Sequence, residues 1–349
     1  MGNADIPKAV RQANNFLVPE LQGYKCVPLA DAFPPIKYCT GGFCFSFPLE
    51  CVGKPNKCLR LWFKDKDKER ERNLDHIKRV SDYFNSNTIK YVIPYKYVDH
   101  ALKLQDGTDI PGVVMKWVDG QTMMSYVKNN YQNTLAIRKL ADKFYEMVRY
   151  HKEHGIAHGD LSDENIIIEP SGEICLIDYD SFYVNNWDTR IPQSTTGVGP
   201  YQHPRRMRGE DLFLNSKMDN FSHQVIYLSL LAISLNPSLF SIRIDESKGE
   251  KEKGLLFKDV DMRSYEAFTS PSSLYNKIRE ISNPEIQKRL SQLCDAFKHP
   301  LSEVCSIVPD PIVIQSKMAS FCGRCGHHFL NQTDIYCPDC GKKRESINI

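Results

Sequence analysis

The pattern of hydrophobic and polar positions divides the chain into a strand-rich half and a helical half. From Tyr24 to Phe63 the sequence is rich in aromatic and β-branched residues punctuated by Pro and Gly, and further short apolar runs follow at 91–98 and 112–118. Short apolar runs bounded by turn residues are typical of β-strands. After Gly120 the apolar positions recur at helical spacing instead, so the pattern predicts a change from sheet to helix near this glycine.

Two later segments predict long helices. The stripe that begins at Ile137 and ends at His151 repeats every three or four residues and stops at Gly155, which is a common helix terminator. The run from Val225 to Leu235 is nearly all apolar but too short to cross a bilayer, so we expect a buried helix. Further helices are expected near 274–282 and 284–297.

These patterns predict an α+β protein in several parts. Residues 1–20 are polar and form either a short helix or a loose arm. Residues 21–117 are expected to form the β-rich lobe and residues 118–306 the helical lobe. A linker at 307–318, which contains two prolines, leads to a small last module at 319–345.

The stretch from His158 to Asp180 carries the candidate chemistry. It contains two short apolar runs separated by a Pro-Ser-Gly turn, which predicts a loop, strand, turn, strand and loop. Asp160, Asn165 and Asp178 stand at the ends of these strands. Phosphoryl transfer needs such a set, because a carboxylate accepts the proton of the attacking hydroxyl while amide and carboxylate oxygens suit Mg²⁺. An ordinary hairpin with turn-forming Asp and Asn is the alternative.

The motifs in this stretch resemble those of protein kinases. H-G-D-L-x-x-x-N resembles the kinase catalytic loop, with Gly159 at the Arg position, and Asp178-Tyr179-Asp180 stands where D-F-G is found. The resemblance implies Asp160 as catalytic base, and Asn165 and Asp178 as Mg²⁺ ligands beside ATP. Because Gly159 replaces the Arg that reads an activation-loop phosphate, we expect activity without that switch. His158 is expected to support the loop through hydrogen bonds rather than act as a base.

Two later motifs extend the resemblance. G-x-x-x-Y-Q-H-P-R-R at 197–206 resembles the end of an activation segment, and D-N-F-S begins at Asp219. The set is similar to a family of bacterial protein-kinase-like proteins with variable C-terminal modules, and it covers about residues 25 to 300. The family resemblance implies a two-lobed fold and a role for Asp219 beneath the catalytic loop. A simple helix N-cap at Asp219 is the alternative.

The strand at 58–64 corresponds in this resemblance to the kinase V-A-I-K strand. Alternation places Cys58 and Arg60 on one face, so Cys58 would lie over the nucleotide base and Arg60 would reach the phosphates. Arg at the Lys position is a departure, because Arg is bulkier and binds phosphate in a bidentate manner. A solvated basic strand face is the alternative.

Two weaker candidates complete the phosphate side of a nucleotide site. Gly41 and Gly42 lie between strand-like runs and form either a turn over a phosphate or an ordinary hairpin turn. The charged run before Leu74 resembles the start of the kinase helix that supplies a Glu to the strand cation. Glu71 or Glu69 would be that partner, unless the run is simply solvated.

The segment after the strand at 112–118 resembles the kinase hinge. Met115 to Val118, including Met115 and Trp117, would present backbone groups to the adenine edge. A plain buried strand is the competing interpretation.

The last module carries two C-x-x-C-G knuckles, eleven residues apart. Four thiolates at this spacing can surround one structural Zn²⁺, and the metal would supply the folding energy of so small a module. The candidate ligands are Cys322, Cys325, Cys337 and Cys340. A redox dithiol pair is the alternative, and the neighbouring histidines are expected at the surface.

Composition narrows the function classes. The 349 residues carry a net charge of +2, which gives no indication of a nucleic-acid or membrane partner. Twelve cysteines without a secretory signal favour a reducing, cytoplasmic location. Together with the cysteine knuckles, the kinase resemblance implies an ATP-, Mg²⁺- and Zn²⁺-binding phosphotransferase, most simply an atypical Ser/Thr protein kinase acting on an unidentified protein. One alternative is a pseudokinase scaffold with a partner-docking zinc ribbon. The other is a small-molecule kinase of the aminoglycoside type, which shares H-G-D-L.

Overall fold

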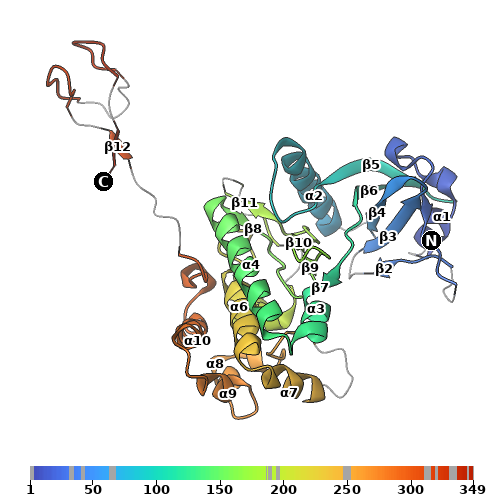
Figure 1. Cartoon of the computed structure of the whole chain (residues 1–349). Helices are drawn as coiled ribbons and strands as arrows, with labels where there is room; N and C mark the ends of the chain where they lie inside the picture. Colours follow the sequence, from blue (N-terminus) through green and yellow to red (C-terminus); the bar gives the residue numbers. More distant parts are fainter. Residues whose placement is uncertain are drawn as a thin grey trace. The chain divides into compact units, whose positions relative to one another are not determined.

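The computed structural model of the chain contains two compact units, Met1–Pro309 and Asp310–Ile349. The residues that it describes are 4–30, 35–40, 44–62, 68–185, 187, 191–193, 197–246, 253–309, 316–318, 321–329, 336–343 and 346–348. Figure 1 shows that the first unit has a sheet-rich part and a helical part, as the hydrophobic pattern predicted. Ile307 and Val308 are buried in the first unit, so the predicted linker begins later than expected.

A six-stranded sheet forms the N-terminal lobe, in the order β1-β3-β4-β6-β5 with β2 paired to β3. Its neighbouring strands are antiparallel. Helix α2 lies beside it (Figure 1). The elements of this lobe are β1 (Lys25–Cys26), β2 (Cys39–Thr40), β3 (Cys44–Cys51), β4 (Lys54–Trp62), α2 (Lys68–Ser86), β5 (Tyr95–Lys103) and β6 (Asp109–Lys116).

The first residues of the chain belong to this lobe rather than to a separate arm. Helix α1 (Asp5–Val10) buries Ile6 and Val10 in a hydrophobic core shared with Leu59 and Leu61 of β4. Residues 59 and 61 alternate with Cys58 and Arg60, so the sheet covers this core with one face and turns its other face toward the helical lobe. The N-terminal segment was ambiguous in sequence because few of its apolar residues lie at regular spacing.

The helical lobe is built around α6 (Asn220–Leu235), in which nearly every residue is buried. The predicted stripe forms α4 (Thr134–Glu153), which packs on α6. The remaining elements of the lobe are β7 (Gln121–Thr122), α3 (Met123–Asn130), β8 (Ile156–Ala157), β9 (Ile166–Ile168), β10 (Ile174–Leu176), β11 (Tyr183–Val184), α5 (Pro204–Met207), α7 (Ser238–Glu246), α8 (Tyr265–Phe268), α9 (Tyr275–Arg279) and α10 (Pro284–Ala296).

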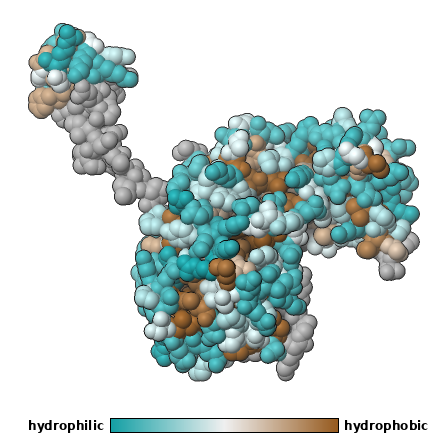
Figure 2. All heavy atoms as spheres, in the orientation of Figure 1, coloured by the Kyte–Doolittle hydropathy of each residue, from teal (hydrophilic) through white to brown (hydrophobic). Residues whose placement is uncertain are grey.

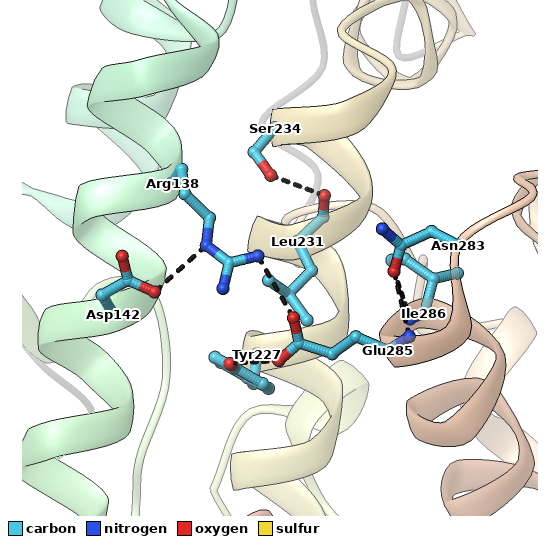
Figure 3. Close-up of polar contacts among 8 residues, drawn as sticks. All are labelled: Arg138, Asp142, Tyr227, Leu231, Ser234, Asn283, Glu285 and Ile286. Carbon is cyan, nitrogen blue, oxygen red and sulfur yellow. Dashed lines mark hydrogen bonds and ion pairs between the residues drawn. The ribbon is translucent and has the colours of Figure 1, made fainter.

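Polar contacts join three of these helices at the surface of the lobe (Figure 3). Arg138 of α4 donates to Asp142 on its own helix at 3.1 Å and to Glu285 of α10 at 3.2 Å. The hydroxyl of Tyr227 on α6 donates to the same Glu285 at 2.8 Å. Glu285 therefore links α4, α6 and α10, while the buried apolar side chains beneath supply most of the packing energy.

Apolar residues in the surface view gather near the junction of the two lobes, and most of the remaining surface in that view is hydrophilic (Figure 2). Among the described residues, no single helix is long and apolar enough to cross a bilayer. Only the pair α6 and α7 together reaches the required length and composition, and that pair is bent by 112°.

The second unit has its own small sheet and a cysteine cluster. Strands β12 (Ser316–Met318) and β13 (Ser346–Asn348) pair in antiparallel fashion. Strand β12 precedes the two cysteine knuckles in the chain and β13 follows them. The second unit therefore extends beyond the predicted limits of 319 and 345 on both sides.

Candidate active site

The loop between β8 and β9 is held from below by Asp219, the residue before α6. Its carboxylate accepts hydrogen bonds from the backbone N–H groups of His158 and Gly159, the second at 2.9 Å. Asp219 occupies the N-cap position of α6 but makes no side-chain cap bond. The role beneath the loop, rather than the N-cap alternative, is therefore confirmed for Asp219.

His158 is fully buried and supports the loop through the backbone. Its Nε2 lies 2.9 Å from the carbonyl oxygen of Ile177, and its Nδ1 accepts from the N–H of Asp160 at 3.3 Å. Nε2 is therefore the donor, and the ring joins the catalytic-loop candidate to the strand that precedes Asp178. This arrangement agrees with the expected structural role.

Gly159 fills a position that has no room for a side chain. Its φ is +84°, and an added Cβ would lie 2.5 Å from the carbonyl oxygen of Ser181 and 2.8 Å from Cε of Met218. Both the backbone conformation and the neighbours disfavour any L residue here. The absence of the kinase Arg at this position follows from the local packing.

Asp160 is partly buried, and its Oδ1 atom is fully buried. Burial raises its pKa to about 7, with further increases from the nearby charges of Asp178 and Asp180 and an opposing effect from Arg206. Its Oδ1 has no hydrogen-bond partner among the described residues. A carboxylate with a pKa near neutrality is suited to accept a proton from a hydroxyl group.

Asn165 is fixed against the same loop. Its side-chain amide donates to the carbonyl oxygen of Asp160 at 2.7 Å, which leaves the carbonyl oxygen Oδ1 of Asn165 available to a cation. Asp178 has a φ of +69°, which is rare for a residue other than glycine, and its side chain is 38% exposed. The structure thus brings the oxygens of Asp160, Asn165 and Asp178 to the ends of β8, β9 and β10.

Tyr179 fixes the position of the Asp-Tyr-Asp loop. The side chain is fully buried, its hydroxyl donates to the carbonyl oxygen of Leu176, and that hydroxyl accepts from the N–H of Ile93 at 2.7 Å. Its ring packs against Phe84 of α2 and Tyr95 of β5. These contacts connect the loop to the N-terminal lobe.

Arg60 projects from β4 toward this loop. Its Nη2 lies 2.9 Å from Oδ1 of Asp178 and 3.1 Å from Oδ2 of Asp180. Its Nε donates to the sulfur of Cys44 at 2.8 Å, and the guanidinium carbon lies 5.5 Å from the centroid of the Trp62 ring. Arg60 is only 9% exposed, so it is not part of a solvated basic strand face.

Cys58 is buried on the same strand face as Arg60, and burial raises the pKa of its thiol to about 12. The thiol is therefore neutral at physiological pH and behaves as a small apolar residue. This character is compatible with the expected contact to a nucleotide base. Gly41, Gly42 and the side chains of Glu69 and Glu71 lie outside the described residues, and β2 and β3 on either side of residues 41–43 pair in antiparallel fashion.

Two hinge candidates are already engaged by the sheet. Met115 lies within β6, in register with Cys58 of β4 and Tyr95 of β5. The backbone N–H of Trp117 donates to the carbonyl oxygen of Asn56 at 3.0 Å. The N–H of Trp117 is therefore used by the sheet, and Met115 and Lys116 both lie in the β4–β6 ladder. The expectation that other backbone groups of Met115 to Val118 contact the adenine edge stays a prediction.

Asp180 is the site residue that the sequence did not single out. It is buried, and its pKa is raised to about 6 by burial, although the charge of Arg60 opposes the increase. One signal was present: a carboxylate stands where D-F-G has glycine, two residues from Asp178.

The four cysteines of the second unit converge, and their Sγ atoms all lie within 4.8 Å of one another. The Sγ atoms of Cys322 and Cys340 are 3.6 Å apart, and those of Cys325 and Cys337 are 3.5 Å apart. Zn–S bonds of about 2.3 Å in a tetrahedron give sulfur–sulfur distances of about 3.8 Å. The cluster therefore has the dimensions of a four-thiolate zinc site.

Each knuckle closes in the same way. The N–H groups of Cys322 and Cys337 donate to the carbonyl oxygens of His327 and Lys342, both at 2.8 Å. Gly326 and Gly341 have positive φ, as the predicted tight turns require. His327 pairs with Asp339 at 2.8 Å rather than with the cysteines.

Comparison with known proteins gives one family. The model of the protein kinase domain matches residues 60–302, which is more than half of the chain. A probable serine/threonine-protein kinase HAL5-like of Eremothecium gossypii is 33% identical over 103 residues, 28% of this chain and 15% of that protein. A probable serine/threonine-protein kinase PknB of Lactococcus lactis is 29% identical over 123 residues, 34% of this chain and 19% of that protein.

A second HAL5-like kinase, from Vanderwaltozyma polyspora, is 26% identical over 230 residues, 57% of this chain and 29% of that protein. The chain thus spans less than a third of the length of each of these relatives. The match to the family model begins at Arg60, the candidate phosphate cation.

Proposed function

The chain belongs to the protein kinase domain family, and from this premise we propose that it is a serine/threonine protein kinase that uses Mg²⁺ and ATP. The observation that carries the proposal is the convergence of Asp160, Asn165, Asp178 and Arg60 at the meeting point of the two lobes. These groups supply a base, two hard oxygen ligands and a cation. Phosphoryl transfer depends on positioning and charge neutralisation, which such a set provides.

In this proposal Asn165 and Asp178 hold Mg²⁺, which would neutralise charge on the phosphates of ATP. Arg60 binds the phosphates from the sheet side. The hydroxyl oxygen of the acceptor bonds to the γ-phosphorus as ADP leaves, and Asp160 accepts the proton of that hydroxyl. The raised pKa of Asp160 supports this role, because a proton passes more readily to a carboxylate of higher pKa.

Transfer from radiolabelled ATP tests the proposal. The full chain is incubated with Mg²⁺ and a mixture of protein acceptors, and labelling of the acceptors or of the chain itself is measured. Asp160→Asn is expected to reduce transfer by about a thousandfold while ATP binding remains. Undiminished transfer in Asp160→Asn or in Asp178→Asn would contradict the assigned roles.

A pseudokinase is the second candidate, favoured by one observation. Arg60 stands at the position of the kinase Lys and is already paired with Asp178 and Asp180. A scaffold would bind nucleotide weakly or not at all and would show no transfer. Thermal shift with ATP and Mg²⁺, followed by the transfer assay, separates the two. Metabolite acceptors in the same assay test the aminoglycoside-kinase alternative, which the protein-kinase similarity makes less favourable.

The second unit is proposed to hold one structural Zn²⁺ through Cys322, Cys325, Cys337 and Cys340. A closed four-sulfur site leaves no position for substrate, so its role would be folding and the docking of a protein partner. We also propose a cytoplasmic location without nucleic-acid or membrane partners. The proposal further includes membership of a bacterial group of kinases with variable C-terminal modules.

A further inference from the structure

We propose that Asp180 is the positioning residue for Arg60, holding its guanidinium in place for the phosphates of a nucleotide. This inference rests on the proposed function. It assigns to the metal-binding loop itself a task that the sequence pattern had assigned to a Glu of α2. Three features support this role: the contacts around Arg60, the unequal exposure of Asp178 and Asp180, and the attachment of the loop through Tyr179.

The contacts of Arg60 surround its guanidinium on three sides. Nη2 is shared between Asp178 at 2.9 Å and Asp180 at 3.1 Å, Nε bonds the sulfur of Cys44 at 2.8 Å, and the Trp62 ring lies 5.5 Å from Cζ. Arg60 is only 9% exposed, and burying a guanidinium is costly unless a carboxylate pairs with it. Among the residues that the structure describes, Asp178 and Asp180 are the carboxylates that pair with Arg60, and they differ in where they lie.

The side chain of Asp178 is 38% exposed, whereas that of Asp180 is 11% exposed. Asp178 is therefore on the solvent side of Arg60 and Asp180 is on the buried side. If Asp178 is committed to a cation, as proposed above, its attraction for Arg60 is largely cancelled. Asp180 is then the carboxylate that still pairs with Arg60 and keeps it from moving away from the new positive charge.

The loop that carries Asp180 is well suited to hold a fixed position. Tyr179 turns into the core between the two carboxylates, and its hydroxyl bonds Leu176 and Ile93. The positive φ of Asp178 lets residues 178 and 180 face Arg60 from either side of that anchor. The carboxylate of Asp180 thus has little freedom to lose when it pairs with Arg60, and such preorganisation strengthens a charged contact.

One functional consequence follows. The position of the phosphate-binding cation is set by the Asp-Tyr-Asp loop, so a loop in the correct position for metal binding also aligns Arg60. The cation and the metal ligand are coupled through three consecutive residues. Replacement of Asp180 is expected to weaken nucleotide binding through Arg60, and not through a general loss of structure.

A double-mutant cycle on the full chain tests this coupling. Binding of Mg²⁺·ATP is measured by titration calorimetry for the wild type, Asp180→Asn, Arg60→Gln and the double variant. We expect Asp180→Asn to weaken binding by about tenfold in the presence of Arg60 and by less than about twofold when Arg60 is Gln. Asp295→Asn, an exposed carboxylate on α10, is the matched control and is expected to bind as the wild type does.

Equal losses in both backgrounds would overturn the inference, because Asp180 would then act independently of Arg60. A wild type that binds and transfers, with an Asp180→Asn variant that does the same, would overturn the inference and leave the proposed kinase function intact. A wild type that binds no nucleotide would overturn both.

Stability gives a second readout in case the single variant folds poorly. Asp180→Asn leaves Arg60 buried without its inner partner, whereas the double variant removes both charges. Breaking a buried pair costs more than replacing it. The melting temperature of the double variant is therefore expected to exceed that of Asp180→Asn, and the reverse order would contradict the pairing.

Discussion

Gly159 offers a quantitative test of how local packing shaped the catalytic loop. The change is Gly159→Ala, with Gly107→Ala as its control. The two glycines have nearly equal φ, +84° and +83°, so an alanine pays the same left-handed backbone cost at both, about 1–2 kcal/mol. They differ in their surroundings, and this difference isolates the effect of packing.

A Cβ at position 107 would have no heavy atom within 4 Å, whereas at position 159 it would lie 2.5 Å from the carbonyl oxygen and 2.6 Å from Cβ of Ser181. Overpacking of this kind costs about 1–3 kcal/mol. We expect Gly107→Ala to lower the free energy of unfolding by about 1–2 kcal/mol and Gly159→Ala by about 2–5 kcal/mol. A larger side chain such as Arg should cost at least as much.

Urea unfolding of the full chain, followed by tryptophan fluorescence, measures the difference. The three tryptophans, Trp62, Trp117 and Trp187, all lie in the first unit, so the signal reports on the kinase-like part. Because Gly159 precedes Asp160, a loop displacement of about 1 Å should also reduce transfer by about a hundredfold. Equal destabilisation by the two alanine variants would refute the packing argument.

Three further predictions follow from other parts of the molecule. Removal of metal with a strong chelator is expected to release one Zn²⁺ per chain and to unfold the second unit, while the first unit keeps its melting temperature. Loss of amide dispersion in the NMR spectrum of the second unit measures this unfolding, and Cys337→Ser should have the same effect. A second unit that is folded in a chain without zinc would contradict the prediction. Burial lowers the pKa of His151 to about 3 and that of His76 to about 4. Below pH 6.5 the unfolded state therefore binds more protons than the folded state. The free energy of unfolding should be highest above pH 6.5 and should fall at lower pH, by about 2 kcal/mol for each histidine at pH 5. Urea unfolding across this range measures the slope, which His151→Phe should reduce; an unchanged slope would count against the assignment. Tyr227→Phe should cost about 1–2 kcal/mol by removing its hydrogen bond to Glu285, and an equal loss in a Glu285→Ala background, where the acceptor is gone, would show that the contact contributes nothing.

The order of the structural elements could be predicted from the chain because each depends on local periodicity. The stripe from Ile137 to His151 has a helical period and became α4, and the short apolar runs after His158 became β9 and β10. The cysteine knuckles were equally clear, since a four-ligand site within one short segment is set by spacing. The packing of α1 on the sheet was not predictable, because it depends on residues from distant strands.

The sequence by itself determined which chemical groups the chain carries and at what spacing: the Asp, Asn and Asp around two strands, an Arg on an earlier strand, and four thiols. Only the tertiary structure decided which groups meet. Asp219 lies 61 residues after His158 yet holds its loop, and Asp180 lies 120 residues after Arg60 yet pairs with it. Contacts between side chains are set by packing across the sheet and the helices. A sequence pattern reports only the local preference of each element, so it cannot specify such pairs.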